Sequence, residues 1–155
     1  MSDAQTPSKT GITLRPVRLA DAASLALLVT ELGSPAPAEQ IAARLSSILG
    51  QTDHHLLVAE GGNDRPVGLL HAAVVPIIET ELTLQIFAMV VAQTSRRAGI
   101  GRQLVKAAEE WGRARGCALV ALRCNIKRLE AHRFWAAAGY ANTKTQYAFR
   151  KPLNT

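Results

Sequence analysis

The sequence predicts an α/β fold in which a mixed, partly antiparallel central sheet carries helices on both faces. Long apolar runs rich in β-branched residues lie between positions 67 and 91 and indicate buried strands. Amphipathic segments with helical spacing lie on both sides of these runs, and glycines end several of them. The expected order is β-α-α-β-β-β-α-β-α-β, an antiparallel meander followed by two parallel crossovers.

The first half of the chain is expected to form one strand, two helices and then three strands. Thr13 to Arg18 is predicted as a strand, and Asp21 is placed to cap a helix that runs toward Glu31. A second helix is predicted from Glu39 to Leu49, after a break that contains two prolines. The strands of the meander are predicted at 55–60, 67–75 and 82–91.

Helices and strands alternate in the second half. An apolar stripe predicts an amphipathic helix from Gly99 to Arg115, and Gly116 supplies its end. A short buried strand is predicted from Ala118 to Arg123 and an alanine-rich helix from Leu129 to Ala138. Thr145 to Lys151 is predicted as the last strand.

Length and composition favour one soluble domain. The chain has 155 residues, of which 48% are hydrophobic and 19% are charged. We expect a flexible tail at residues 1–10 and a single domain at residues 11–155. No apolar run reaches the ~18 residues of a membrane helix, the start lacks a secretory signal, and a cytoplasmic location is expected. The histidines match no metal-ligand spacing, so no metal is expected: His54, His55, His71 and His132.

The positive charge is concentrated in one segment. The net charge of the chain is +6, and 13 of its 18 basic residues are arginines. Residues 96–133 contain ten basic and three acidic residues, a net charge of +7. Such a segment indicates an anionic partner, namely a phosphate group, a nucleic acid or a membrane. A solvated helix face in an arginine-rich protein is the alternative.

The junction of a strand and a helix carries the features of an anion site. A helix N-terminus presents amide N–H groups without helical partners and a partial positive charge. Gly99 and Gly101 bring those amides within reach of a pyrophosphate, and arginines surround them: Arg96, Arg97 and Arg102. A turn that only lets the helix start close to the strand is the alternative. A Walker loop and a dinucleotide fingerprint are excluded, because the required Lys and third Gly are missing.

Two segments resemble a known family. Met89 to Gly101 is similar to motif A of the GNAT acetyltransferase superfamily, with its Q/R-x-x-G-x-G/A signature. Ala131 to Tyr140 is similar to motif B, which is written A-H-R-F-Y-x-x-x-G-F/Y. The expected order of elements also matches, so the resemblance runs from Thr13 to Lys151.

This resemblance implies a GNAT acyltransferase fold and an acetyl-CoA-dependent N-acetyltransferase. Acetyl-CoA is the co-substrate, and a primary amine of a small molecule or protein receives the acetyl group directly. Backbone groups of Met89 and Val91 would pair with the pantetheine arm, and amides 97–102 would hold the pyrophosphate. The implied cofactor-binding residues are Met89, Val90, Val91, Arg96, Arg97, Ala98, Gly99, Ile100, Gly101, Arg102, Asn125, His132 and Trp135.

The general base is not evident. Acetyl transfer needs a neutral amine, whereas a lysine-like amine with a pKa of about 10.4 is protonated at pH 7. Relatives carry a carboxylate at the position of Gln85, which accepts no proton. Glu81 lies ~13 Å away along the strand and would act only through water. A hairpin that turns near residues 77–78 would place His71 opposite Leu84 or Gln85, and we hypothesise His71 as the base.

The general acid also departs from the family pattern. Relatives use the Tyr of motif B to protonate the leaving thiolate, and this chain has Trp135, whose indole N–H is no acid in this pH range. Tyr140 and Tyr147 are possible substitutes. Cys124, at a strand end, is expected to be inert.

Three functions are compared. The first is the N-acetyltransferase, with acetyl-CoA and an amine acceptor as partners and neither nucleic acid nor membrane. The alternative is an acyl-CoA-binding module with weak or lost catalysis, which Gln85 and Trp135 motivate. A nucleic-acid-binding protein would need aromatic residues among the arginines, and those present are at expected core positions. The sequence leaves open whether the protein forms a homodimer.

Overall fold

The computed structural model describes residues 6–7 and 11–154. Its sheet has six strands in the described part of the chain, in the spatial order β1-β2-β3-β4-β5-β6. Neighbours from β1 to β5 are antiparallel, and β5 and β6 are parallel. The strands are β1 (Thr6–Pro7), β2 (Thr13–Pro16), β3 (His54–Glu60), β4 (Pro66–Val75), β5 (Thr83–Val91) and β6 (Leu119–Leu122).

Four α-helices and two short 3-10 helices accompany the sheet in the described residues. Their bounds are η1 (Leu19–Asp21), α1 (Ala22–Leu32), α2 (Ala38–Ile48), η2 (Gln93–Ser95), α3 (Ile100–Ala114) and α4 (Leu129–Ala137). The chain divides into two compact units, residues 1–123 and 124–155. The first unit holds the whole sheet with α1, α2 and α3, and the second holds α4 and the segment that follows it.

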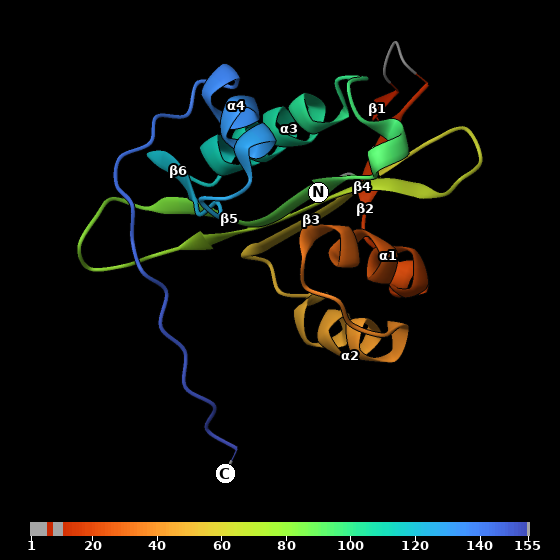
Figure 1. Ribbon diagram of the computed structural model, residues 1–155, viewed down its shortest axis with the longest axis horizontal. Helices are drawn as coiled ribbons and strands as arrows, with labels where there is room; N and C mark the ends of the chain where they lie inside the picture. Colours follow the sequence, from red (N-terminus) through yellow and green to blue (C-terminus); the bar gives the residue numbers. More distant parts are fainter. Residues whose placement is uncertain (1–5, 8–10, 155) are drawn as a thin grey trace. The chain divides into compact units, whose positions relative to one another are not determined.

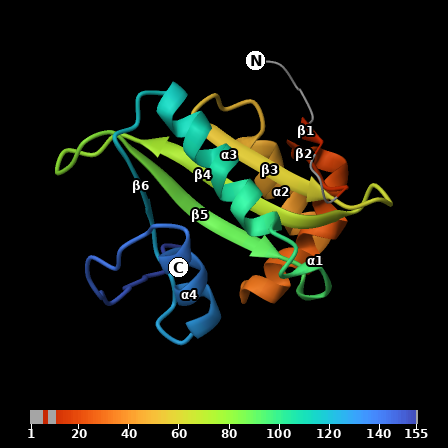
Figure 2. The same cartoon turned by 90° about the horizontal axis from the view of Figure 1, so that it is seen from above.

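Helices cover both faces of the sheet in the first unit (Figures 1 and 2). On one face, Val58, Leu69 and Val90 pack with buried residues of α1 and α2. On the other face lies α3, and its Gly112 is so close to β5 that an added Cβ would stand 3.1 Å from Leu84. These two layers confirm the predicted mixed sheet with helices on both faces.

A β-bulge interrupts the pairing of β4 and β5. His71 lies opposite Ala88 while Ala72 lies opposite Ile86, so Phe87 has no partner in β4. An extra residue reverses the faces to which the following side chains point. Accordingly, Leu84 faces α3, whereas Val90 packs with α1 and α2.

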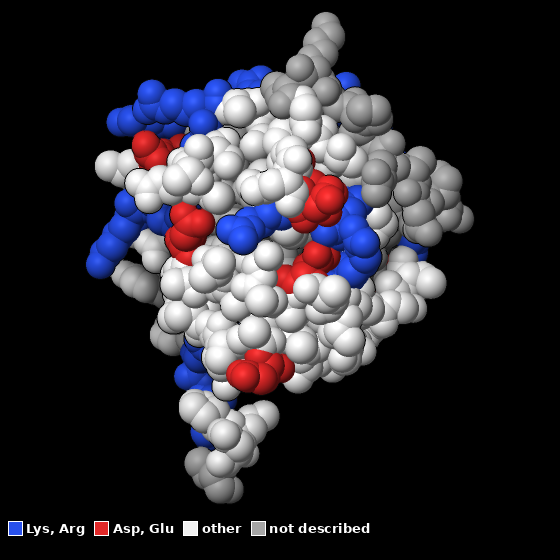
Figure 3. All heavy atoms as spheres, turned by 90° about the vertical axis from the view of Figure 1, so that its right-hand side faces the viewer, with Lys and Arg blue, Asp and Glu red and all other residues white. Residues whose placement is uncertain are grey.

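A buried ion network fixes the start of α1 to the sheet. Arg15 on β2 donates two hydrogen bonds to the carboxylate of Asp21, at 2.8 and 2.7 Å, and one to Glu60 at the end of β3. All three side chains are buried, and Asp21 also accepts the amide of Arg18. Asp21 therefore holds the N-cap position that the sequence predicts, but its carboxylate bonds to the preceding segment rather than to the first turn of α1. Figure 3 shows acidic and basic side chains next to one another near the middle of this side of the molecule.

The prediction of a last strand from Thr145 to Lys151 is wrong. Residues 141–154 form no helix or strand, and Tyr147 and Phe149 are each 91% exposed. The alternating pattern does place these two rings near each other, with centroids 6.5 Å apart. A strand also needs a neighbour for its backbone groups, and this segment has none in the described residues.

At the other end, the predicted tail at residues 1–10 lies mostly outside the described residues, although Thr6–Pro7 pairs with Thr13 and Leu14. Over residues 6–7 and 11–154, no helix combines the length and apolar content that crossing a membrane requires.

Candidate functional site: a free strand edge that ends in a helix N-terminus

The edge of β5 is paired with β6 along half of its length. The ladder runs from Thr83 opposite Leu119 to Ile86 opposite Leu122 and ends there. Beyond it, residues 88–91 of β5 pair with β4 alone in the described part of the chain. The bulge at Phe87 therefore stands at the point where β5 and β6 part.

The backbone of this free edge offers hydrogen-bonding groups. The amide of Ala92 donates to Val67 O on β4 at 2.8 Å. Because successive residues of a strand point their backbone groups to opposite sides, Val90 also faces β4, and Met89 and Val91 face away from it. Arg96 Nε donates to the carbonyl oxygen of Val91 at 3.0 Å, which agrees with that direction.

The loop after β5 leads into the N-terminus of α3. The first hydrogen bond of the helix joins Gln103 N–H to Gly99 O at 3.1 Å, so the amides of Ile100 and Gly101 have no acceptor within the helix. Gly99 has a φ of 79°, and an added Cβ there would meet no atom within 4 Å. The Cβ side of Gly99 therefore faces open space, and the amides of the first turn are suited to an anion.

Basic side chains and one carboxylate surround this loop. The predicted arginines at positions 96, 97 and 102 are all exposed. Arg97 has a φ of 69°, the left-handed conformation that non-glycine residues rarely adopt. Glu31, near the end of α1, accepts the amide of Gln93 through Oε1 at 3.0 Å. Left-handed residues in a turn can arrange successive backbone amides into a concave nest that binds anions.

His71 does not lie where the sequence predicts. The strands turn later than expected, with Val75 opposite Thr83, and the bulge shifts the register again, so His71 lies opposite Ala88 and not opposite Leu84 or Gln85. Gln85 is opposite Ala73. His71 Nε2 is 2.9 Å from His54 Nδ1, and its ring centroid is 5.1 Å from that of Phe87. Burial, and then the neighbouring His54, lower the pKa of His71 to about 4.

Glu81 is far from this region. It precedes β5 at the end where β5 and β6 are paired, whereas the loop of Gly99 follows the opposite end of the strand. The carboxylate is exposed, and hydrogen bonds from its own backbone amide and from Thr80 lower its pKa. The structure does not bring Glu81 together with the candidate site.

The other predicted site residues lie in the second unit. Trp135 is buried, and its ring meets Phe134 and Tyr140 edge to face with centroids 5.0 Å apart in both pairs. Asn125 Oδ1 accepts the amide of Lys127 at 2.9 Å, and its backbone oxygen lies 2.8 Å from His132 Nε2. His132 thus holds the turn before α4. Tyr147 is exposed, and Cys124 is a half-buried free thiol.

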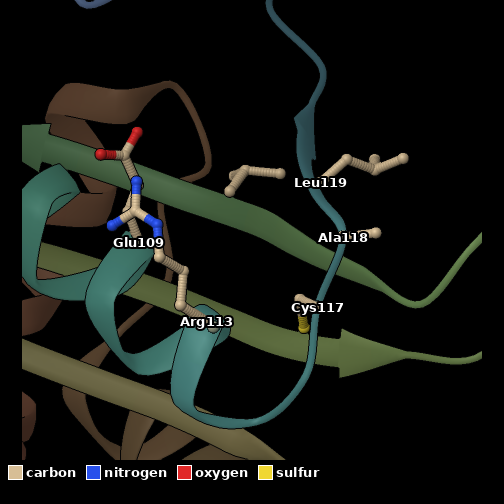
Figure 4. A pocket seen from close by; sticks show the side chains of 7 residues that line it. Glu109, Arg113, Cys117, Ala118 and Leu119 are labelled. Carbon is tan, nitrogen blue, oxygen red and sulfur yellow. The ribbon is translucent and has the colours of Figure 1, made fainter.

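A small hollow elsewhere contains none of the predicted site residues. It lies between the C-terminal half of α3 and the start of β6 (Figure 4). Its walls include Glu109, Arg113 and Cys117. Burial raises the pKa of the Cys117 thiol, so the thiol stays protonated at neutral pH and is no nucleophile.

The comparison with known families decides the identity. The profile of the Acetyltransferase (GNAT) family matches residues 24–140, three quarters of the chain, and crosses both units. This chain belongs to the GNAT acetyltransferase family. The prediction of an acetyl-CoA-dependent N-acetyltransferase is therefore confirmed at the level of the family.

Several characterised proteins are similar to this acetyltransferase. An aminoglycoside N(6')-acetyltransferase type 1 of Klebsiella aerogenes is 27% identical over 146 residues, which cover 90% of this chain and 96% of that protein. An aminoalkylphosphonate N-acetyltransferase of Salmonella typhimurium is 42% identical over 65 residues, 42% of this chain and 41% of that protein. The structure of aminoglycoside N-acetyltransferase AAC(6')-Iy with CoA has a TM-score of 0.80 and 19% identity, covering 94% of this chain and 98% of that one.

Sequence reasoning missed three residues of the acetyltransferase's candidate site. The bulge at Phe87 leaves no sequence signal, because it depends on how two strands pair. The sequence shows only that His54 matches no metal-ligand spacing, and its contact with His71 requires the register of β3 on β4. The sequence gives Glu31 only as the end of the predicted first helix. The structure shows its carboxylate accepting the amide of Gln93, which is 62 positions away in the sequence.

Proposed function

We propose that this enzyme binds acetyl-CoA along the free edge of β5 and transfers the acetyl group to a primary amine. The observation that supports it best is the continuity of this edge with the N-terminus of α3. The edge offers backbone groups of Met89 and Val91 to an amide-containing chain, and the loop offers amides and arginines to a pyrophosphate. CoA is a molecule that joins an amide-containing arm to a pyrophosphate.

The proposed binding residues follow from this placement. Met89, Val90 and Val91 line the pantetheine arm, and the loop holds the pyrophosphate with Arg96, Arg97, Ala98, Gly99, Ile100, Gly101 and Arg102. Arg96 would release Val91 O when the arm pairs with it. Asn125, His132 and Trp135 complete the proposed set. Asn125 has its side-chain oxygen engaged by Lys127, so only its amide N–H groups are available to a ligand.

The reacting carbon would lie beside the bulge. An extended arm that pairs with Val91 and Met89 next reaches Phe87, ~13 Å from Val91 along the strand. A backbone N–H of the free edge would stabilise the oxyanion that forms on the thioester carbonyl. Because a thiol has a pKa of about 8.5, the thiolate leaves without an acid, and Trp135 serves as a wall rather than a proton donor. Tyr140, whose ring packs on Trp135, is likewise assigned no proton transfer.

The acceptor is proposed to be a small molecule that carries several primary amines. Two relatives at 27% and 28% identity are aminoglycoside N(6')-acetyltransferases, and a partial relative acetylates aminoalkylphosphonates by name. An aminoglycoside-like amine is therefore the first acceptor to assay, ahead of a protein amine. The enzyme is proposed to work in the cytoplasm, where acetyl-CoA is available, with residues 11–155 acting as one domain.

Turnover assays test this proposal. The full chain would be incubated with acetyl-CoA and neamine, 2-aminoethylphosphonate, spermidine or a lysine peptide, with free thiol and product mass as readouts. We expect amine-dependent release of CoA and a product heavier by one acetyl group for at least one small amine. Binding of acetyl-CoA without any amine-dependent turnover would contradict the proposal and favour the acyl-CoA-binding module.

A further inference from the structure

Two histidines share a hydrogen bond beside the point where β5 and β6 part. His54 begins β3 and His71 lies in β4, two positions apart in register, so both side chains stand on one face of the sheet. Their nitrogens Nδ1 and Nε2 are 2.9 Å apart, a hydrogen-bond distance. Phe87, the bulge residue, packs on both rings at centroid distances of 6.5 and 5.1 Å. The pair is thus joined to the bulge.

An acceptor amine would reach the bulge from the face that carries this pair. The opposite face is covered by α3, which packs closely on Gly68 and Leu84. On the histidine face, Phe87 remains 54% exposed although it contacts His71. The half of this face nearer Val90 is filled by α1 and α2. Within the first unit, the open approach to the end of the free strand edge therefore passes over Phe87 and the imidazoles.

The contacting atoms determine which proton transfers are possible. A single proton lies between His54 Nδ1 and His71 Nε2, because two neutral imidazoles form one hydrogen bond with one donor. When His71 Nε2 carries that proton, His71 Nδ1 has a free lone pair and His54 carries its own proton on Nε2. The outer nitrogens of the pair are His54 Nε2 and His71 Nδ1. Neither has a hydrogen-bond partner among the described residues, and neither is among the fully buried atoms without a partner. Both outer nitrogens therefore reach solvent.

We propose that His54 and His71 form a two-imidazole proton relay that deprotonates the acceptor amine, with Phe87 as the platform for its cationic form. This inference rests on the proposed function and adds His54 and Phe87 to it. An ammonium group over the face of Phe87 is stabilised by a cation–π interaction. His71 contacts the acceptor and is a catalytic residue, while His54 acts through His71.

The protons and bonds of the proposed reaction balance. His71 Nδ1 takes a proton from the ammonium, His71 Nε2 passes its proton to His54 Nδ1, and His54 Nε2 releases its proton to water. The neutral amine then forms the C–N bond as the C–S bond breaks. The second proton of the amine leaves with the thiolate as the thiol. In sum, an ammonium and a thioester give an amide, a thiol and one proton in solvent.

A relay suits this site better than a single base. Burial lowers the pKa of His71, and His54 is the charged or titratable neighbour that acts on it electrostatically. An isolated His71 would therefore hold a proton poorly. Passing the proton on to His54 avoids a long-lived charge in the half-buried ring.

Kinetics of matched variants test the relay. His54→Phe keeps a ring on Phe87 but breaks the relay, and His71→Ala removes the base. His55→Phe is the control, because His55 is the next residue of β3 and stacks on Trp111 on the opposite face. All would be assayed with acetyl-CoA and the amine of the panel that the wild type acetylates fastest. If the wild type acetylates none, the proposed function fails before the relay is reached.

The relay predicts a specific pattern. His54→Phe lowers kcat about 10–100-fold with the KM for acetyl-CoA unchanged, and the deficit shrinks as pH approaches the pKa of the amine. Added imidazole restores part of the activity of His71→Ala, whereas His55→Phe retains kcat and the pH profile. A wild type that turns over while His54→Phe keeps its kcat and pH profile would overturn the relay alone.

Nitrogen-15 NMR of the wild-type histidines tests the proposed relay even if a variant fails to fold. The relay requires His71 as the Nε2–H tautomer with Nδ1 unprotonated, and His54 Nδ1 as the acceptor. A His71 protonated on Nδ1 at neutral pH would overturn it, because the base nitrogen would then be blocked.

Discussion

At the scale of single residues, Arg97 combines an unfavourable backbone with a useful charge. Its φ of 69° costs a non-glycine residue about 1–2 kcal/mol. It stands in the loop proposed to hold the pyrophosphate. Under that proposal, the strained position places a cation beside the bound anion.

Replacing Arg97 separates the two effects. Arg97→Gly removes the left-handed penalty and adds the entropy cost of glycine, so the free energy of unfolding should change by less than about 1 kcal/mol. The affinity for acetyl-CoA should fall about 3–10-fold because one cation is lost. Urea unfolding and calorimetric titration measure the two quantities. Arg97→Val is the control, since it loses both charge and stability. Weaker folding of Arg97→Gly with unchanged affinity would refute the assignment.

His55 makes the stability of the fold depend on pH. Its ring stacks on Trp111 at a centroid distance of 4.6 Å, and burial lowers its pKa to about 4. In the unfolded chain a histidine has a pKa of about 6.5, so between pH 6.5 and 4 the unfolded state binds more protons. The stability is complete above pH 6.5 and is lost as the pH falls toward 4. His71 contributes in the same direction.

Replacing His55 by phenylalanine keeps an aromatic ring but removes the titrating group, and should therefore reduce the dependence of stability on pH. We expect the free energy of unfolding of the wild type to fall between pH 7.5 and 4.5, and that of His55→Phe to fall by about 1–2 kcal/mol less. Urea unfolding at both pH values measures the difference. Equal losses in the two proteins would show that His55 is protonated in the folded state.

At the scale of elements, one hydrogen bond couples α1 to the loop of the candidate site. Glu31 lies near the C-terminus of α1, where the helix dipole disfavours a carboxylate, and accepts the amide of Gln93. The residue before Gln93 has φ −52° and ψ 137°, angles that a residue before proline adopts readily. Gln93→Pro therefore removes the N–H with little change in the chain path.

The coupling predicts non-additive variants. Glu31→Ala and Gln93→Pro should each raise the KM for acetyl-CoA about 2–5-fold, because each frees the start of the loop. The double variant should resemble the single variants, since both delete the same hydrogen bond. Steady-state kinetics of the four proteins complete the cycle. Additive effects would mean that the two residues act independently.

The helices and strands also show which structural features can be predicted from sequence patterns. Helical spacing and β-branched runs predicted α1 to α4 and β2 to β6 to within a few residues, because both signals are local. The loop at Gly99 followed from glycines next to arginines at a strand–helix junction. The position of His71 could not be predicted, because the bulge at Phe87 arises from pairing between strands distant in sequence. The prediction of a last strand from Thr145 to Lys151 was wrong for the same reason, because an alternating pattern does not show whether a neighbouring strand is available.

At the scale of the whole molecule, the family match extends over both compact units. The family profile spans residues 24–140 and so includes β3 to β6 and α4. The first unit holds the free edge of β5, the loop and the histidine pair, and the second unit holds Trp135 and Asn125. A net charge of +6 suits a protein whose co-substrate carries several phosphates. The central claim is that the free edge of β5 and the start of α3 bind acetyl-CoA.

Thermal unfolding with ligands tests that claim most directly. Acetyl-CoA or CoA at 1 mM should raise the Tm of the wild type by about 5–10 °C, as for a ligand at ~100 times its Kd, while ATP and NAD have little effect. A folded Gly99→Val/Gly101→Val variant should lose this shift, because valine side chains block the loop amides. If acetyl-CoA leaves the Tm of the wild type unchanged, or stabilises the variant equally, the edge and the loop are not its binding site.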